Sequence, residues 1–164
     1  MDKKMQEQLK GLRKWLLEHW GELNRQIFIK ESEEEKKLSD KELKETCIKY
    51  AKNNFQGYKY INENIAREIL VSGRGIGKFG SITKSRDQSL SLKELKKILQ
   101  WAKKTYKTPD NKKRHTVDGF TYFEQSIEVN SKSYTVKMAT KDTHGNQSSY
   151  YYHFLEEEPN KEKK

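Results

Sequence analysis

The strongest constraint on the fold is a period-two alternation of apolar and polar residues in the last third of the chain. The alternation runs through residues 120–130, 133–143 and 148–156, and short turn-forming sequences separate these three segments. Such spacing is typical of β-strands, and short turns join antiparallel neighbours. The sequence therefore predicts a three-strand antiparallel meander.

The register of this meander decides which side chains share a face. Two-residue turns would pair Val129 with Tyr134 in the first hairpin and Met138 with His153 in the second. That register places His153 on the core side, whereas a slip of one residue would place it on the opposite face. The core face would carry Phe123, Ile127, Val129, Tyr134, Val136 and Met138. The opposite face would carry Tyr122, Lys137 and Lys141.

Helical periodicity dominates the rest of the chain. Apolar residues recur every three or four positions near the N-terminus, which predicts an amphipathic helix within residues 1–30. Its apolar face would pack on the rest of the chain or on a partner. Residues 31–37 (ESEEEKK) are expected to form a charged linker. Capping-box spacing then predicts helix starts at Ser39 and at Ser91, the second helix continuing to about Tyr106.

These patterns together predict an α+β protein with N-terminal helices and a four-stranded antiparallel sheet. In chain order the sheet region would contain a strand at residues 69–71, a helix, and the three-strand meander. We expect residues 38–156 to form one domain and residues 157–164 to be a disordered tail. The helices would cover one face of the sheet, and the other face would be exposed, basic and aromatic.

A glycine-rich basic segment, residues 72–80 (SGRGIGKFG), follows the first predicted strand and holds four of the nine glycines. It contains the spacing G-x-G-x-x-G and approaches a Walker loop, both of which bind nucleotides at the start of a helix. Here the segment leads into β-prone residues, and no helix is expected before about Ser91. We therefore expect a basic turn that brings Arg74 and Lys78 to a cleft beside the meander.

The charge distribution favours a polyanionic partner. The net charge is +10, and the positive excess lies in residues 51–153, whereas the two ends are close to neutral. Clustered positive charge of this kind attracts nucleic acid, and RNA is the favoured candidate. The alternative is that the lysines only keep the surface soluble.

Cysteine and histidine usage argues against disulfide and metal chemistry. The single cysteine, Cys47, excludes an internal disulfide and a cysteine-based zinc site. The four histidines are scattered, so no metal and no cofactor is expected. The chain has no run of apolar residues long enough to span a membrane. We expect a cytoplasmic protein without a membrane partner.

Metal-independent cleavage of RNA is the catalytic chemistry that these residue types could support. It needs a base, an acid and cations that stabilise the charge of the transition state. Lys78, Lys137, His153 and Tyr151 are the catalytic candidates. The candidates for contacts with nucleic acid are Arg74, Lys84, Arg86, Arg114 and Lys141.

Residues 54–156 resemble the barnase/colicin/RelE-like nuclease domains found in phage and integrative-element proteins. The similar features are a strand ending in ILVSGRGIGK, the helix SLSLKELKKILQWAKKT, and the strands FTYFEQSIEVN, KSYTVKMATKD and SYYYHFL. The resemblance implies a metal-independent endoribonuclease of toxin type encoded on a mobile element. The sequence lacks two features of that family, an Ile-Lys-acidic triplet near Lys78 and a histidine that opens the helix near Ser91.

Two other functions remain open from the sequence. The same fold could serve as a non-catalytic module that binds nucleic acid. It could also serve as a protein-interaction module, in which the N-terminal helix contacts a partner or a second copy of the chain.

Overall fold

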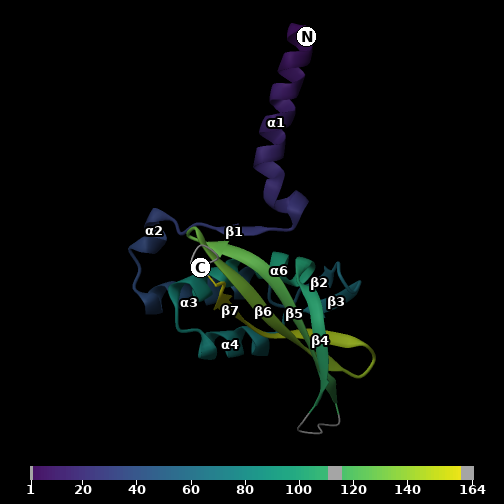
Figure 1. Cartoon of the computed structure of the whole chain (residues 1–164). Coiled ribbons are helices and arrows are strands. Elements are labelled where there is room, and N and C mark those ends of the chain that lie inside the picture. Colours follow the sequence, from purple (N-terminus) through teal and green to yellow (C-terminus); the bar gives the residue numbers. More distant parts are fainter. Residues whose placement is uncertain (1, 111–115, 160–164) are drawn as a thin grey trace.

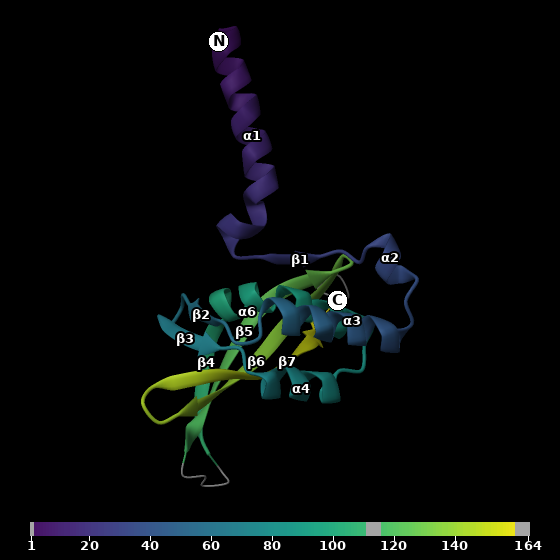
Figure 2. The same cartoon turned by 180° about the vertical axis from the view of Figure 1, so that it is seen from behind.

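The computed structural model describes residues 2–110 and 116–159, and these residues form a curved mixed sheet with helices packed against it (Figures 1 and 2). The strands are β1 (Ile27–Ile29), β2 (Lys59–Asn62), β3 (Arg67–Leu70), β4 (Lys103–Pro109), β5 (Val117–Val129), β6 (Lys132–Thr143) and β7 (Gln147–Glu157). The helices are α1 (Lys3–Asn24), α2 (Glu33–Lys36), α3 (Asp40–Asn54), α4 (Gly73–Ile82), α5 (Arg86–Ser91), the 3-10 helix η1 (Leu92–Glu94) and α6 (Leu95–Trp101).

The predicted four-stranded antiparallel sheet is wrong. The sheet has seven strands in the order β1-β5-β6-β7-β3-β2, and β4 also pairs with β5. Two of the pairings, β1 with β5 and β3 with β7, are parallel. The long strand β5 allows this arrangement, because one of its edges pairs with β4 near residues 119–124 and with β1 at residues 127–129. The coarser prediction of an α+β protein is compatible with the structure.

The core lies between the helices and one face of the sheet. The predicted apolar face of the meander is buried there, against side chains of α3 to α6. Burial of this apolar surface is the main stabilising contribution to such a fold. The largest fully buried apolar side chains from the helices are Leu43, Ile76, Phe79, Leu90, Leu92, Leu95, Ile98 and Leu99.

The register of the meander agrees with the prediction in part of the second hairpin and not in the first. Met138 pairs with His153 as predicted, but nearer the turn Thr143 pairs with Gln147, so the predicted two-residue turn is wrong and the bulge after Ala139 restores the expected pairs. In the first hairpin Val129 pairs with Lys132, so the predicted pairing with Tyr134 is wrong by two residues. The turn consists of Asn130 and Ser131, which both have positive φ, as a tight two-residue hairpin turn requires. A shift of two residues leaves the same side chains on each face.

The glycine-rich segment is a helix, α4, so the predicted turn is wrong. Ser72 caps the helix, and its hydroxyl oxygen accepts a hydrogen bond from the Gly75 amide at 3.1 Å. The helix lies against β7 next to Ser148 and Ser149, where β3 pairs with that strand. A Cβ atom added at Gly75 would lie 2.1 Å from the carbonyl oxygen of Tyr150. The glycine is therefore needed for the close approach of helix and strand.

The helix predicted from Ser91 to Tyr106 is also wrong in its bounds. Ser91 ends α5 and its side chain does not cap η1, whereas the capping box of Ser39 and Glu42 at the start of α3 is present as predicted. Helix α6 ends at Trp101, and the chain continues as β4. The Thr and Tyr residues of this segment favour a β-strand over a helix end.

The N-terminal helix α1 projects away from the sheet (Figure 1). It ends at Asn24, and the apolar residues that follow form β1 rather than a last helical turn. The segment expected to be a charged linker contains the short helix α2, which begins with a capping box of Ser32 and Glu35.

Candidate nucleic-acid interface

The face of the sheet opposite the helices carries a row of tyrosines. The pairing registers align Tyr106 of β4, Tyr122 of β5, Ala139 of β6 and Tyr152 of β7 across four strands. The rings of Tyr106 and Tyr122 are stacked, with centroids 4.5 Å apart and an interplanar angle of 16°. The small side chain of Ala139 leaves the rings of Tyr122 and Tyr152 as the raised parts of this surface.

A β-bulge brings a further aromatic residue to the same face. The register of β6 and β7 shifts between Ala139 and Thr140, so that Tyr151 is an extra residue in β7. Tyr151 therefore lies beside Tyr152, with ring centroids 5.3 Å apart, instead of pointing to the opposite face. Its ring also lies 5.0 Å from that of Phe120. We call this surface the aromatic platform, and it consists of Tyr106, Phe120, Tyr122, Tyr151, Tyr152 and Phe154.

Two lysines supply positive charge at the platform. Lys78 of α4 places its ammonium nitrogen 3.7 Å from the centroid of the Tyr151 ring and 5.1 Å from that of Tyr152. Lys141 of β6 pairs with Phe120 on the neighbouring strand. Neither lysine forms an ion pair with an acidic residue among the described residues. This end of the platform is therefore electrostatically suited to an anion.

The hydroxyl group of Tyr152 stays protonated at physiological pH. Burial raises the pKa of the Tyr152 hydroxyl, and the neighbouring Tyr122, Tyr106 and Tyr151 raise this pKa further. A protonated hydroxyl donates a hydrogen bond and does not repel phosphate.

The opposite end of the same face is neutralised by acidic side chains. The Lys137 ammonium lies 3.0 Å from a carboxylate oxygen of Glu124 and 3.4 Å from one of Glu156. The hydrogen bond to Glu124 raises the pKa of Lys137, so its ammonium group stays charged. The two carboxylates neutralise this charge. Lys137 is thus on the predicted face, although its charge is shared with two carboxylates.

A groove of about 400 Å³ adjoins this end, where the neighbour of β5 changes from β4 to β1. Its lining includes two cationic side chains, Arg25 and Lys103, and the carboxylate of Glu124. The lining residues are Arg25, Gln26, Lys103, Thr105, Glu124, Gln125, Ser126 and Thr135.

His153, the predicted catalytic histidine, lies in the core and has an exposure of 0%. Ser91 donates its hydroxyl proton to the carbonyl oxygen of Gln88 at 2.6 Å, so it accepts a hydrogen bond from Nε2–H of His153 at 2.8 Å. The hydroxyl of Tyr150 then donates to Nδ1 at 2.7 Å. Burial lowers the pKa of His153 to about 3. A neutral imidazole with both nitrogens bonded inside the core has a structural role.

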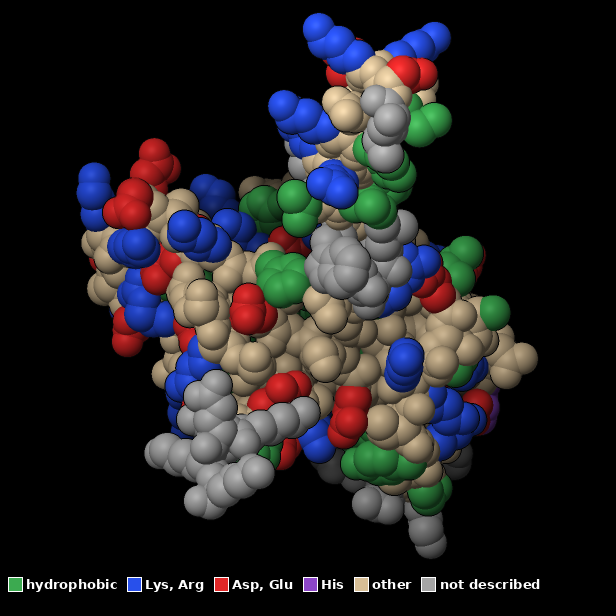
Figure 3. Space-filling view, turned by 45° about the horizontal axis from the view of Figure 1, so that its top comes forward, with side chains coloured by type: hydrophobic (Ala, Val, Ile, Leu, Met, Phe, Trp, Pro, Cys, Tyr) green, Lys and Arg blue, Asp and Glu red, His purple; other side chains and the backbone are tan. Residues whose placement is uncertain are grey.

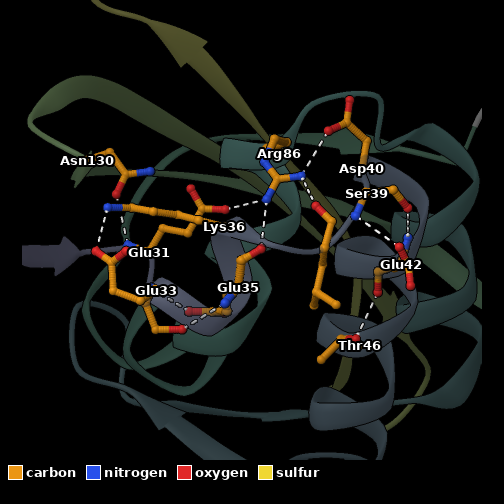
Figure 4. Close-up of polar contacts among 12 residues, drawn as sticks. Glu31, Glu33, Glu35, Lys36, Ser39, Asp40, Glu42, Thr46, Arg86 and Asn130 are labelled. Carbon is orange, nitrogen blue, oxygen red and sulfur yellow. Dashed lines mark hydrogen bonds and ion pairs between the residues drawn. The ribbon is translucent and has the colours of Figure 1, made fainter.

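Arg86, predicted to contact nucleic acid, instead donates hydrogen bonds to the segment between β1 and α3 (Figure 4). One guanidinium nitrogen donates to Glu31 at 2.5 Å and to the carbonyl oxygen of Glu35 at 3.0 Å. The other donates to the carbonyl oxygen of Leu38 at 2.8 Å and to Asp40 at 3.0 Å. The backbone amide of Glu31 is also bound by the side chain of Asn130 at 2.8 Å. The donors of Arg86 are thus engaged within the chain.

The remaining predicted residues are dispersed. Arg74 is exposed on α4, one turn before Lys78, and Lys84 is exposed just after this helix. Arg114 lies outside the described residues. Of the sequence candidates, the structure brings Lys78, Tyr151 and Lys141 together, places Lys137 at the far end of the same face, and separates His153 and Arg86 from them.

Tyr106, Phe120 and Phe154 belong to the platform but are not among the residues expected from the sequence. The β-prone residues Thr105, Tyr106 and Thr108 are the available signal for a strand there, but its pairing with β5 is not visible in the sequence. No cluster of metal-ligating side chains is found within residues 2–110 and 116–159. No helix in the described part of the chain is long and apolar enough to cross a membrane.

Comparison with protein-family models matches residues 39–152 to the family described as Large polyvalent protein-associated domain 3. The match covers well over half of the chain and contains every member of the platform except Phe154. Comparison with curated proteins and with solved structures finds no match. The family match agrees with the expected association with phage and mobile-element proteins, and it gives no support to a barnase, colicin or RelE-like nuclease fold.

Proposed function

The chain belongs to the family Large polyvalent protein-associated domain 3, and we propose that it binds single-stranded nucleic acid on the open face of its sheet. The observation that carries this proposal is the aromatic platform with Lys78 held over the rings of Tyr151 and Tyr152. Aromatic rings that accept stacked bases, combined with cations that meet the phosphates, form the usual surface for single strands.

The geometry of the platform favours single strands over duplexes. Tyr106 has an exposure of 56%, and the other platform rings are partly exposed on one surface. Bases can stack on such rings only when they are not stacked within a duplex. Each base stacked on an aromatic side chain contributes about 1–3 kcal/mol to binding, largely independent of sequence. The platform is therefore suited to low sequence specificity.

The positive charges define one end of the bound strand. Lys78 and Lys141 lie at the end of the platform near Phe120 and Tyr151, whereas Glu124 and Glu156 compensate Lys137 at the other end. Phosphates would therefore contact the first end, and bases would extend along the row from Tyr152 to Tyr106. Release of counterions by these lysines makes the affinity dependent on salt.

We propose binding without cleavage of the strand. The four residues predicted for catalysis do not converge, because His153 is enclosed in the core and Lys137 is paired with two carboxylates. Lys78 and Tyr151 remain together, and the cation–π contact between them suits a binding role.

The test is fluorescence anisotropy of labelled oligo(U) and oligo(dT) of about 12 nucleotides with the full chain at low salt. We expect binding to both, and an increase in Kd of at least tenfold for the double variant Tyr122→Ala/Tyr152→Ala, which removes stacking of at least one base. Tyr58→Ala removes an exposed tyrosine that lies outside the platform and should leave Kd unchanged.

Gel analysis of the RNA in EDTA monitors cleavage. No binding at low salt, or equal effects of the platform and control variants, would disprove the proposal.

A further inference from the structure

Helix α1 exposes an apolar stripe along one of its faces. The stripe consists of Met5, Leu9, Leu12 and Leu16, which recur at intervals of four, three and four residues and are all exposed. Figure 3 shows hydrophobic side chains along one side of the projecting helix, with Lys and Arg near its free end. Amphipathic helices are stable mainly because the apolar face is covered.

The charges of α1 oppose its own dipole. Asp2 caps the helix by accepting a hydrogen bond from the Met5 amide at 2.8 Å, but Lys3 and Lys4 then occupy the first turn. The first turn has no acidic residue and the last turn has no basic residue. The sequence places all five Lys and Arg of the helix within residues 3–14, whereas residues 15–24 have none. Positive charge near a helix N-terminus is unfavourable unless a neighbour compensates it.

We infer that α1 pairs with α1 of a second copy of this chain in an antiparallel arrangement. This arrangement places the Lys-rich half of each helix beside the half of its partner that has no Lys or Arg. It also orients the two helix dipoles antiparallel, which is favourable. Leu9 of one copy then faces Leu12 of the other, and Met5 faces Leu16. Because α1 projects away from the sheet, the two sheet domains lie at opposite ends of the helix pair and do not collide (Figure 1).

The interface is small, so the dimer is expected to dissociate on dilution. Four apolar side chains from each copy form the contact, far fewer than in obligate dimers. The surface is separate from the aromatic platform on β4 to β7, so this inference stands whether or not the chain binds nucleic acid.

Sedimentation velocity of the full chain between about 1 and 100 μM tests the pairing. We expect the mass to rise from 19.5 kDa towards twice this value over that range. Leu12→Glu should keep the protein monomeric throughout, because it places a charge in the centre of the stripe. Leu17→Glu is the matched control, since Leu17 has an exposure of 81% and lies outside the stripe; it should dimerise like the wild type.

Crosslinking tests the orientation. Met5→Cys chains mixed with Leu16→Cys chains should form a mixed disulfide dimer, whereas Met5→Cys alone should not crosslink, because an antiparallel pair keeps the two Met5 positions apart. A monomer at all concentrations, or equal effects of Leu12→Glu and Leu17→Glu, would overturn the inference. So would a monomer that sediments with anionic lipid vesicles, because the stripe would then bind a lipid surface.

Discussion

The ammonium group of Lys78 lies over the ring of Tyr151, with its nitrogen 3.7 Å from the ring centroid. Lys78 belongs to α4, and Tyr151 is the extra residue of the bulge in β7. Their contact depends on the close approach of α4 to β7 that Gly75 allows. The glycine-rich segment therefore contributes to the aromatic platform as a packed helix that holds a cation above an aromatic ring.

Replacing Lys78 with Gln should weaken nucleic-acid binding and reduce its dependence on salt. Loss of one phosphate contact lowers the slope of log K against log salt by about 1. Anisotropy titrations at several salt concentrations measure this slope. Lys49→Gln, an exposed position on α3, is the matched control and should leave the slope unchanged. An unchanged slope for Lys78→Gln would show that this lysine does not contact phosphate.

Replacing Tyr106 with Ala should weaken binding by about 1–3 kcal/mol, because one stacking surface is lost. Tyr106→Trp should retain binding, since indole also stacks on bases. The ring of Tyr106 is largely exposed, so thermal unfolding of both variants should resemble that of the wild type. If Tyr106→Trp bound as weakly as Tyr106→Ala, the tyrosine would act through its hydroxyl and not through stacking.

Gly75→Ala and Gly77→Ala should change stability in opposite directions. A Cβ atom at Gly75 would lie 2.1 Å from the backbone oxygen of Tyr150, whereas one at Gly77 would meet no atom within 4 Å. We expect Gly75→Ala to lower the free energy of unfolding by about 3 kcal/mol. Gly77→Ala should raise it by about 1 kcal/mol, because alanine favours the helix. Urea denaturation measures both, and similar values for the two variants would contradict the packing of α4 on β7.

The buried imidazole of His153 should make stability rise with pH between about 3 and 6.5. Its pKa is lowered to about 3 in the folded protein, while the unfolded chain binds a proton near pH 6.5. In this range the unfolded state therefore holds more protons, and one such group contributes a slope of about 1.4 kcal/mol per pH unit. His153→Gln should remove this contribution, as seen in urea denaturation at a series of pH values. If the free energy of unfolding depended on pH equally in wild type and variant, His153 would be protonated or accessible to solvent in the folded protein, which would contradict its burial.

The strands of the meander could be predicted from the sequence because their alternation is local. Apart from β3, which overlaps the strand expected at residues 69–71, the other strands could not be predicted in this way. Strand β1 has only three residues, and Ile27 continues the spacing of the preceding helix. The identity of Lys103–Pro109 as β4 depends on its pairing with β5, which no local pattern encodes. A turn is expected in place of α4 because four glycines normally disfavour a helix. The contact with Tyr150 that requires one of these glycines is non-local, so the sequence does not reveal it.

The candidate site could be predicted in part for the same reason. Alternation places Tyr122, Lys137 and Lys141 on one face, as the structure does. Adjacent residues of a regular strand point to opposite faces, so alternation would separate Tyr151 from Tyr152. The bulge in β7 joins them, and it could not be recognised from residue types alone. His153 resembles a catalytic residue in sequence, whereas its hydrogen bonds to Ser91 and Tyr150 depend on the packing of α5 against the sheet.

Ultraviolet crosslinking of a bound single-stranded oligonucleotide, followed by mass spectrometry of the peptides, tests the central claim most directly. The platform should supply the crosslinked residues, so we expect adducts on Tyr106, Tyr122, Tyr151 and Tyr152 and none on exposed aromatic residues elsewhere, such as Tyr58 and Trp15. Binding with crosslinks confined to α1 or to the helical face would contradict the claim that the open face of the sheet is the nucleic-acid interface.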